Sequence, residues 1–206
     1  MLYIMNDDPL KGEDEQNLIK TINQVVANYD VVITTDYGHG MMTSTAIKSL
    51  CKHARFLSVN TQSNAGNHGF NPVSKYLRAD YVCLSNHEIS IETRMREGNL
   101  RDLILEVHQH IDCNRITTTL GRVGSLHYDA EEGFTEVPAL ATSVKDRVGA
   151  GDAVLALTSP MVAQSTPWDI VGFVGNVAGA LMVSELGNRR PISKIPLCKH
   201  IISLLK

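Results

Sequence analysis

Hydrophobic and polar positions follow two alternating spacings along the chain. Apolar residues spaced three and four apart predict helices at residues 13–29, 46–51, 100–107, 150–163 and 167–185, and in a last segment ending near Leu205. Short β-branched or aromatic runs predict strands at 31–34, 56–59, 81–84, 116–119, 126–128 and 134–137. Because strands and helices alternate, the pattern predicts an α/β fold with a mostly parallel central sheet covered by helices on both faces.

Polar residues and prolines mark several element boundaries. Thr43 and Asn99 precede apolar helical segments and are expected to cap them. Pro167 is expected in the first turn of its helix, and Pro160 is expected to end or kink the preceding one. The two strands on either side of DAEEG are expected to form a hairpin.

The predicted elements describe a single domain over residues 1–206, since the sequence contains neither a repeat nor a low-complexity linker. Ligands of such sheets bind beyond the carboxyl ends of the strands. The candidate binding loops are therefore residues 35–42, 60–71, 85–90 and 120–125.

Composition narrows the range of partners. The net charge is −3 with acids and bases interspersed, which argues against a nucleic-acid-binding surface. The longest apolar runs are too short for a membrane span, and the first residues do not resemble a secretory leader. The four cysteines are scattered, as expected for buried free thiols in a reducing, cytoplasmic compartment.

The segment KDRVGAGDAVLAL, residues 145–157, places two glycines and an acid where an apolar helix begins. Backbone N–H groups at a helix start bind anions, and Gly149 and Gly151 let a phosphate approach closely. Asp152 would repel a static anion, but it suits a base that takes the proton of a hydroxyl attacking phosphorus. The alternative is an ordinary glycine-rich helix start with an acid favoured by the helix dipole.

Several motifs, in a fixed order, resemble those of the ribokinase-like (PfkB) carbohydrate kinases. DRVGAGDA is similar to the family's C-terminal signature, and TTDYGHG at 34–40 resembles a turn of its heptose-7-phosphate kinase and ADP-heptose synthase branch. TTLGRVGSLHYD at 118–129 and FVGNVAGALMVSELG at 173–187 are similar to its nucleotide-binding turn and penultimate helix. The resemblance implies a three-layer α/β/α kinase that uses ATP and Mg²⁺, with K⁺ as a further cofactor.

The resemblance also assigns roles to individual residues. It implies that Asp152 is the catalytic base and that Gly149, Ala150 and Gly151 supply the anion-hole amides. The carbonyl oxygens of Asp146 and Val148 would bind a monovalent cation. The nucleotide-binding residues would be Thr119, Gly121, Gly124 and Asn176. A plain tight turn at the two glycines and a helix-packing amide at Asn176 remain alternatives.

Other positions depart from the family pattern. The family's Asn-x-x-Glu motif organises Mg²⁺ through water; here Glu88 matches the acid, but Ser85 occupies the Asn position and Asn86 lies one place on. Glu88 is therefore either a magnesium residue, with Asn86 as the substitute, or a helix-start acid. The expected substrate-binding residues are Asp36, His39 and Asn60. Asp36 and His39 have plain turn residues as their alternatives.

The chain is also shorter than the family's usual length, and the resemblance implies that it starts about a third of the way into the family's kinase domain. The lid strands and most sugar contacts are therefore expected to be missing, and the resemblance covers the C-terminal, nucleotide-binding two-thirds of the kinase domain. The expected function is phosphoryl transfer from ATP to a sugar hydroxyl, with a heptose phosphate as the acceptor. The alternative is a nucleotide-binding or assembly module without its own activity. A dinucleotide-binding oxidoreductase would need GxGxxG, which GHGMMT does not supply.

Expected partners are a nucleotide and a small sugar or sugar phosphate, with no nucleic acid and no membrane. The exposed strand edge that would remain without a first strand must pair or be covered. A missing N-terminal segment, a nucleotidyltransferase module or a second copy of the chain are the candidates for covering it.

Overall fold

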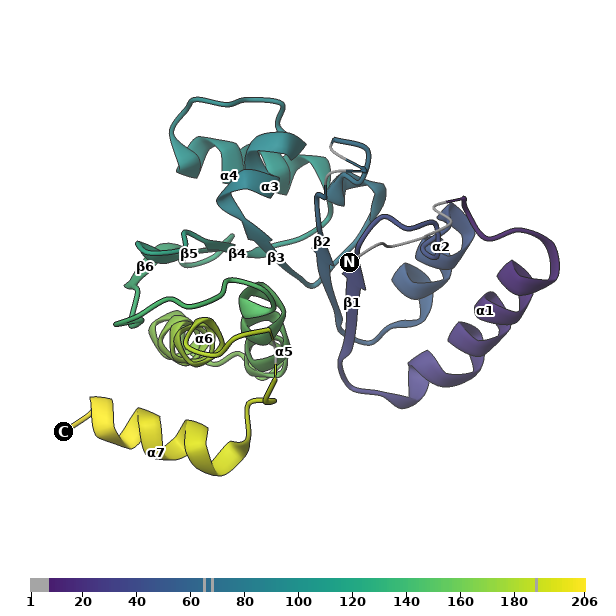
Figure 1. Ribbon diagram of the computed structural model, residues 1–206. Helices are drawn as coiled ribbons and strands as arrows, with labels where there is room; N and C mark the ends of the chain where they lie inside the picture. Colours follow the sequence, from purple (N-terminus) through teal and green to yellow (C-terminus); the bar gives the residue numbers. More distant parts are fainter. Residues whose placement is uncertain (1–7, 65, 68, 188) are drawn as a thin grey trace. The chain divides into compact units, whose positions relative to one another are not determined.

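The computed structural model describes residues 8–64, 66–67, 69–187 and 189–206, and it divides the chain into two compact units (Figure 1). The first unit contains residues 1–114 and the second residues 115–206. Residues 65 and 68, which belong to the predicted 60–71 loop, and residues 1–7, which carry the leader prediction, lie outside the described residues.

Parallel strands form the centre of the first unit. They are β1 (Val32–Asp36), β2 (Leu57–Thr61) and β3 (Tyr81–Ser85). β1 pairs with β2 in register, so that Asp36 lies opposite Thr61, and β2 pairs in parallel with β3. The three strands confirm the three predicted at 31–34, 56–59 and 81–84. Their carboxyl ends, where ligands of such sheets bind, carry Asp36 and Ser85.

Helices and short 3₁₀ turns connect these strands. They are α1 (Gly12–Val25), η1 (Val26–Asn28), α2 (Ser44–His53), η2 (Val73–Lys75), α3 (Asn86–Glu92) and α4 (Leu100–His110). α1 packs on α2, which buries Ala46, Ile47 and Leu50. The predicted caps are confirmed, because Thr43 accepts the N–H of Ala46 and Asn99 accepts that of Arg101.

Residues 85–90 were expected to be a loop, and that expectation is wrong, because Ser85 ends β3 and the helix α3 follows it directly. Residues 86–92 form the helix α3, which begins with a reciprocal capping box. The Ser85 hydroxyl accepts the Glu88 N–H at 3.3 Å, and the Glu88 carboxylate accepts the Ser85 N–H at 2.7 Å. The sequence contains the usual signal for such a helix start, a Ser followed three positions later by a Glu, at Ser85 and Glu88.

The second unit combines an antiparallel meander with three helices. Its strands are β4 (Arg115–Thr119), β5 (Gly124–Asp129) and β6 (Gly133–Pro138), and its helices are α5 (Ala150–Ala163), α6 (Trp168–Val183) and α7 (Lys194–Leu204). β5 pairs antiparallel with both β4 and β6, which confirms the predicted hairpin. α6 packs on α5 and on the hairpin strands, and its buried glycines, Gly172 and Gly175, permit this close packing.

The two prolines behave differently from the sequence expectations. α5 continues through Pro160 to Ala163, so Pro160 does not end it. The buried hydroxyls of Thr158 and Ser159 donate to carbonyls one turn back, and the helix packs along α6. Pro167 is the N-cap of α6 rather than a residue of its first turn.

The prediction that the four cysteines are buried free thiols is confirmed for two of them. Cys83 and Cys113 are buried free thiols as expected, and Cys51 is half-buried, but Cys198 on α7 is exposed, so the prediction of burial is wrong there.

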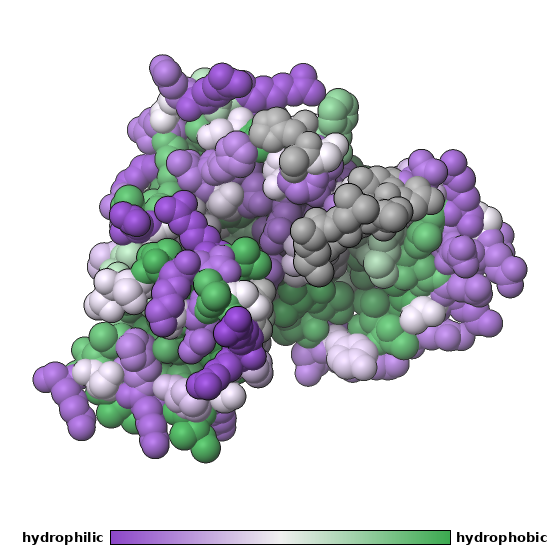
Figure 2. Space-filling view, viewed as in Figure 1, coloured by the Kyte–Doolittle hydropathy of each residue, from purple (hydrophilic) through white to green (hydrophobic). Residues whose placement is uncertain are grey.

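Hydrophilic and hydrophobic side chains alternate over the visible face (Figure 2). Among the residues that the structure describes, no helix has the length and apolar character needed to cross a bilayer.

His127 lies at the centre of a buried polar group in the second unit. Its Nδ1 lies 2.8 Å from Thr117 Oγ1, and its Nε2 lies 2.8 Å from Ser125 Oγ. Its ring stacks on Trp168 with a centroid separation of 5.4 Å. Burial lowers the pKa of His127 to about 4, because a charged imidazolium would lose its hydration there.

We expect the stability of the protein to fall as the pH drops from about 6.5 to about 4. In that range the unfolded chain binds a proton at His127 that the folded chain does not, which removes on the order of 3 kcal/mol. Below about pH 4 this contribution is already lost. Urea unfolding at several pH values measures it. His127→Gln should flatten the pH dependence and His110→Gln should not; equal slopes in all three proteins would contradict the assignment.

Candidate functional site

The start of α5 has the geometry of an anion site. Gly149 is the N-cap and adopts a left-handed conformation with φ of 78°, which favours glycine. A Cβ added at Gly151 would have no heavy atom within 4 Å, so the backbone is open there. The Ala150 N–H donates to Arg147 O over a long 3.4 Å. Asp152 lies half-buried in the first turn, next to the N–H groups that a helix leaves without intrahelical acceptors.

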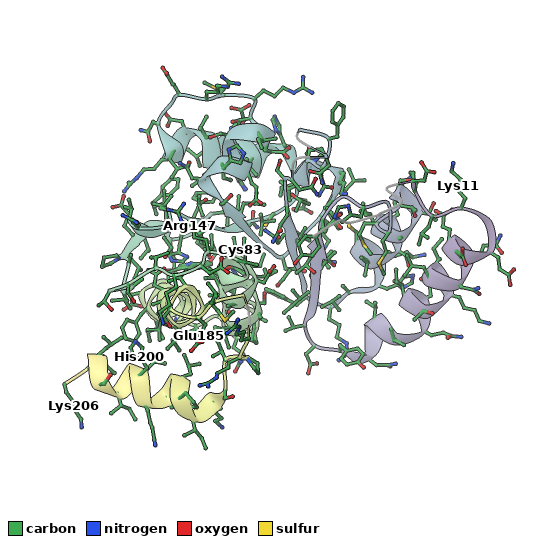
Figure 3. The ribbon with its side chains drawn as sticks, viewed as in Figure 1. Lys11, Cys83, Arg147, Glu185, His200 and Lys206 are labelled. Atoms are coloured by element: carbon green, nitrogen blue, oxygen red, sulfur yellow. The ribbon has the colours of Figure 1, made fainter. Side chains whose placement is uncertain are left out.

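The Asp146 carboxylate fixes the loop that leads into α5. Its Oδ1 accepts the Val148 N–H at 3.1 Å, and its Oδ2 accepts the Gly187 N–H at 3.0 Å. The N–H groups of residues 145 and 146 donate in turn to Val183 O. These donors hold the pKa of Asp146 below its usual range. The loop that carries Arg147, labelled in Figure 3 together with Glu185, is thereby tied to the end of α6.

We expect Asp146→Ala to release this loop without unfolding the second unit. Amide hydrogen exchange of Val148 and Gly187 should become roughly tenfold faster, because both N–H groups lose a charged acceptor. Exchange in the middle of α5 should stay unchanged, since those amides donate within the helix. NMR-detected exchange measures both, and uniform acceleration over the whole unit would show a global effect instead.

The expected nucleotide-binding turn connects β4 and β5. Thr119 ends β4, and Gly121 follows with φ of 59° in an exposed tight turn. Gly124 has φ of 128°, and a Cβ there would lie 2.1 Å from Val137 O. Gly124 is therefore required by the close approach of β6. This packing is sufficient to explain the second glycine of the motif, and its contact with a nucleotide stays a prediction.

Asn176 on α6 lies at the end of the same hairpin. Its Nδ2 donates to Val137 O at 3.0 Å and to Pro138 O at 2.9 Å. Since Gly124 pairs with Pro138, the structure brings Asn176 and the glycine turn together at one end of the hairpin. Asn176 thus fulfils the role of a helix-packing amide, and its place near an adenine ring stays a prediction.

In the first unit, Asp36 is buried and its carboxylate is surrounded by donors. Oδ1 accepts the Gly38 N–H at 2.9 Å, while Oδ2 accepts the Tyr76 hydroxyl at 2.8 Å and lies 2.6 Å from Lys75 Nζ. Burial, followed by the charge of Asp36, raises the pKa of Tyr76, so that its hydroxyl stays a donor. The Asn71 side chain donates a hydrogen bond from Nδ2 to the backbone carbonyl of Asp36, and its Oδ1 accepts one from Lys75 Nζ.

These contacts show that the Asp36 carboxylate is bonded to groups of the protein itself. A carboxylate with three donors has little capacity left for a sugar hydroxyl, so its predicted contact with substrate has no additional support. The roles of Lys75, Tyr76 and Asn71 were not predicted from the sequence, because these residues lie 35 to 40 positions away from Asp36 in the chain.

The other two expected substrate residues differ in their surroundings. Asn60 is buried at the end of β2 and donates from Nδ2 to the carbonyl of Cys83, a residue labelled in Figure 3. Within the described residues, Asn60 Oδ1 has no hydrogen-bond partner. His39 is half-buried in the turn between Gly38 and Gly40, both of which have positive φ. Both assignments stay predictions.

Glu88 and Asn86 lie in the first turn of α3. The Glu88 carboxylate serves the capping box and accepts a further N–H from Ser63. Burial raises the pKa of Glu88, although these hydrogen bonds act in the opposite direction. Asn86 is exposed. Among the described residues, no group of three or more His, Cys, Asp or Glu could hold a metal ion. The geometry of Glu88 fits a helix cap, and a magnesium role would require water or nucleotide oxygens as the other ligands.

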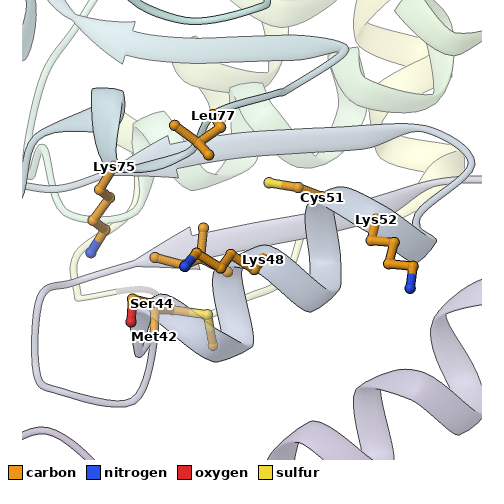
Figure 4. A pocket seen from close by; sticks show the side chains of 8 residues that line it. Met42, Ser44, Lys48, Cys51, Lys52, Lys75 and Leu77 are labelled. Atoms are coloured by element: carbon orange, nitrogen blue, oxygen red, sulfur yellow. The ribbon is translucent and has the colours of Figure 1, made fainter.

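A groove of about 500 Å³ follows one side of α2 (Figure 4). Its apolar lining includes Ile47 and Leu77, and its lysines are Lys48, Lys52 and Lys75. None of the residues expected to carry the chemistry lines this groove. Lys75 connects this groove to the Asp36 cluster, which we define as Asp36, Asn71, Lys75 and Tyr76.

Sequence comparisons identify relatives that extend beyond this chain. The bifunctional protein HldE of Bradyrhizobium diazoefficiens is 29% identical over 184 residues, which cover 87% of this chain and 36% of that protein. The protein of the same name from Campylobacter curvus is 26% identical over 191 residues, covering 91% of this chain and 40% of that protein. The chain therefore spans well under half the length of these curated relatives.

Solved structures share the fold. Phosphofructokinase-2 from Escherichia coli, in complex with potassium, superposes with a TM-score of 0.78 at 17% identity over 96% of this chain and 64% of that one. Arabidopsis thaliana ribokinase, complexed with ribose and ATP, gives a TM-score of 0.67 at 19% identity over 98% and 62% of the two chains. The expected three-layer ribokinase-like α/β/α fold is thereby confirmed. The sequence profile of the pfkB family carbohydrate kinases matches residues 42–195, well over half of the chain, and the protein belongs to this family.

Proposed function

We propose that this chain is the nucleotide-binding part of a carbohydrate kinase that transfers the terminal phosphoryl group of ATP to a sugar hydroxyl. The observation that carries the proposal is the start of α5, where a left-handed Gly149 precedes a helix whose first turn contains the half-buried Asp152. A carboxylate in the first turn of a helix whose N-terminal amides can bind an anion supports in-line phosphoryl transfer.

In the proposed reaction, Asp152 accepts the proton of the attacking hydroxyl. The amides of Gly149, Ala150 and Gly151 stabilise the charge on the phosphoryl oxygens. Asp146 holds the preceding loop in place through the Val148 and Gly187 amides. Asn176 and the Gly121 turn bind the nucleoside end.

Two cations accompany this proposal. Magnesium bound with ATP would neutralise phosphate charge, with Glu88 and Asn86 contributing through water. The carbonyl oxygens of Asp146 and Val148 would hold a monovalent cation. The potassium complex of Escherichia coli phosphofructokinase-2, which shares the fold, supports potassium as this cation.

A heptose phosphate is the proposed acceptor. It is supported by the likeness of the 34–40 turn to the heptose-kinase branch and by the HldE relatives. His39 and Asn60 would contact the sugar. Ribose, fructose and keto-deoxy sugar acids are the other acceptors to test.

The internal contacts of the Asp36 carboxylate favour a second candidate function, a nucleotide-binding or assembly module without independent turnover. In that case a further N-terminal segment, a nucleotidyltransferase module or a second copy of the chain would complete the acceptor side. The chain covers only 36% of the HldE protein of Bradyrhizobium diazoefficiens, and the Asp36 carboxylate is already bonded inside the protein.

Calorimetric titration with a non-hydrolysable ATP analogue and with each sugar, together with an ATP-dependent turnover assay, separates the two candidates. Turnover with a heptose phosphate supports the kinase. Nucleotide binding without sugar binding or turnover supports the module. Failure to bind the nucleotide would contradict both.

A further inference from the structure

The helix α7 presents an apolar stripe that the proposed kinase reaction does not use. Ile195 and Ile202 are 68% and 55% exposed, Leu205, the C-cap of the helix, is 72% exposed, and Cys198 between them is exposed as well. We call these four residues the α7 stripe. No residue of α7 is fully buried, although the helix packs on α6 and its Leu197 is half-buried.

The spacing of the stripe is that of a helix-pairing seam. Its members are separated by three, four and three positions, which is the a-d-a-d pattern of two-stranded coiled coils. The half-buried Leu197 and Ile201 occupy positions c and g, so Ile201 borders the seam on one side. The stripe therefore remains exposed after α7 has packed in its own unit.

Basic residues flank this seam. With Ile195 at position a, Lys194 occupies position g, and Lys199 and Lys206 occupy position e. The segment 189–206 also contains Arg189 and Arg190 and has no Asp or Glu, whereas the whole chain has a net charge of −3. In Figure 3, His200 is labelled on this helix and Lys206 just beyond its end, and Figure 2 shows hydrophobic and hydrophilic surface side by side over α7.

We propose that the α7 stripe is a docking surface for an amphipathic helix of another protein, with apolar residues along its seam and carboxylates at its flanking positions. Carboxylates would pair with the lysines at e and g, which set partner choice in such helix pairs. A second copy of α7 fits poorly, because its lysines would face like charges. Because α7 has 11 residues, fewer than two heptads, the surface favours a reversible, moderate-affinity partner.

The test uses two fluorescein-labelled helical peptides of about 20 residues, with Leu at a and d and either Glu or Lys at e and g. Fluorescence anisotropy should show that this chain binds the Glu peptide roughly tenfold more tightly than the Lys peptide. Ile202→Asn should weaken that binding at least about tenfold. The matched control is Ile170→Asn, an exposed isoleucine on α6 that is 46% accessible, and it should bind like the unchanged chain.

A charge-reversed chain provides an independent gain-of-function test. Lys199→Glu combined with Lys206→Glu should exchange the preference, so that the Lys peptide binds more tightly. Equal binding of both peptides, or equal loss in the two isoleucine variants, overturns the proposal. Sedimentation with phosphatidylserine vesicles in the absence of peptide binding also overturns it and assigns the stripe to an anionic bilayer. None of these measurements depends on kinase activity.

Discussion

Asp152→Asn is expected to lower turnover about 10³-fold while leaving nucleotide affinity nearly unchanged. Asparagine preserves the size of the side chain and can accept a hydrogen bond, but it cannot take the proton of the attacking hydroxyl. Because the residue lies in the first turn of α5 and is only half-buried, the substitution should leave the fold intact. Steady-state turnover and calorimetric nucleotide binding measure the two effects separately.

The matched control for this substitution is Asp169→Asn. Asp169 also lies in the first turn of an apolar helix, α6, where its Oδ1 accepts the N–H of Ile170. Both variants lose one negative charge near a helix N-terminus, so any general effect of the helix dipole appears in both. Turnover by Asp152→Asn equal to that of Asp169→Asn would contradict the role of Asp152 as base.

Elements whose signals are local were predictable from the sequence. Helical spacing and the caps Thr43 and Asn99 located α2 and α4, because capping involves neighbouring residues. The helix α5, which begins at Ala150, was also predicted, since its apolar helical spacing is a local signal. The helix α3 was missed although its capping box, Ser85 and Glu88, is equally local.

Roles that depend on distant residues were not predictable. The predicted nucleotide contact of Gly124 is untested, but the β6 backbone requires its missing side chain, and no local signal in the sequence indicates this. The predicted sugar contact of Asp36 is likewise untested, and its partners Lys75 and Tyr76 meet it only after folding. The sequence located polar groups correctly at loop ends, but it did not show which of them the protein itself satisfies.

The Asp36 cluster joins three loop segments of the first unit. Its contacts connect the 36–40 turn to Asn71 and to the end of η2 at Lys75. The Asp36 side chain is 3% exposed and that of Lys75 is 25% exposed, so the ion pair is largely shielded from water. Removing one partner of such a pair leaves an uncompensated buried charge, which costs far more than the pair contributes as a whole.

Lys75→Met is therefore expected to lower the free energy of unfolding by about 3 kcal/mol. Methionine retains much of the apolar stem but leaves Asp36 with only the Gly38 and Tyr76 donors. Adding Asp36→Asn to Lys75→Met should recover part of the loss, because the unpaired charge is then removed. A double-mutant cycle from urea unfolding measures this coupling.

Lys48→Met tests whether the loss belongs to the buried pair or to any lysine of the α2 groove. Lys48 lines the same groove but is exposed, so its removal should change stability by no more than about 0.5 kcal/mol. Equal stability of Lys48→Met and Lys75→Met would mean that solvent screens the Asp36 contact. A clear difference between them would mean that Lys75 stabilises the fold of the 36–40 turn, and with it the position from which His39 meets an acceptor in the proposed reaction.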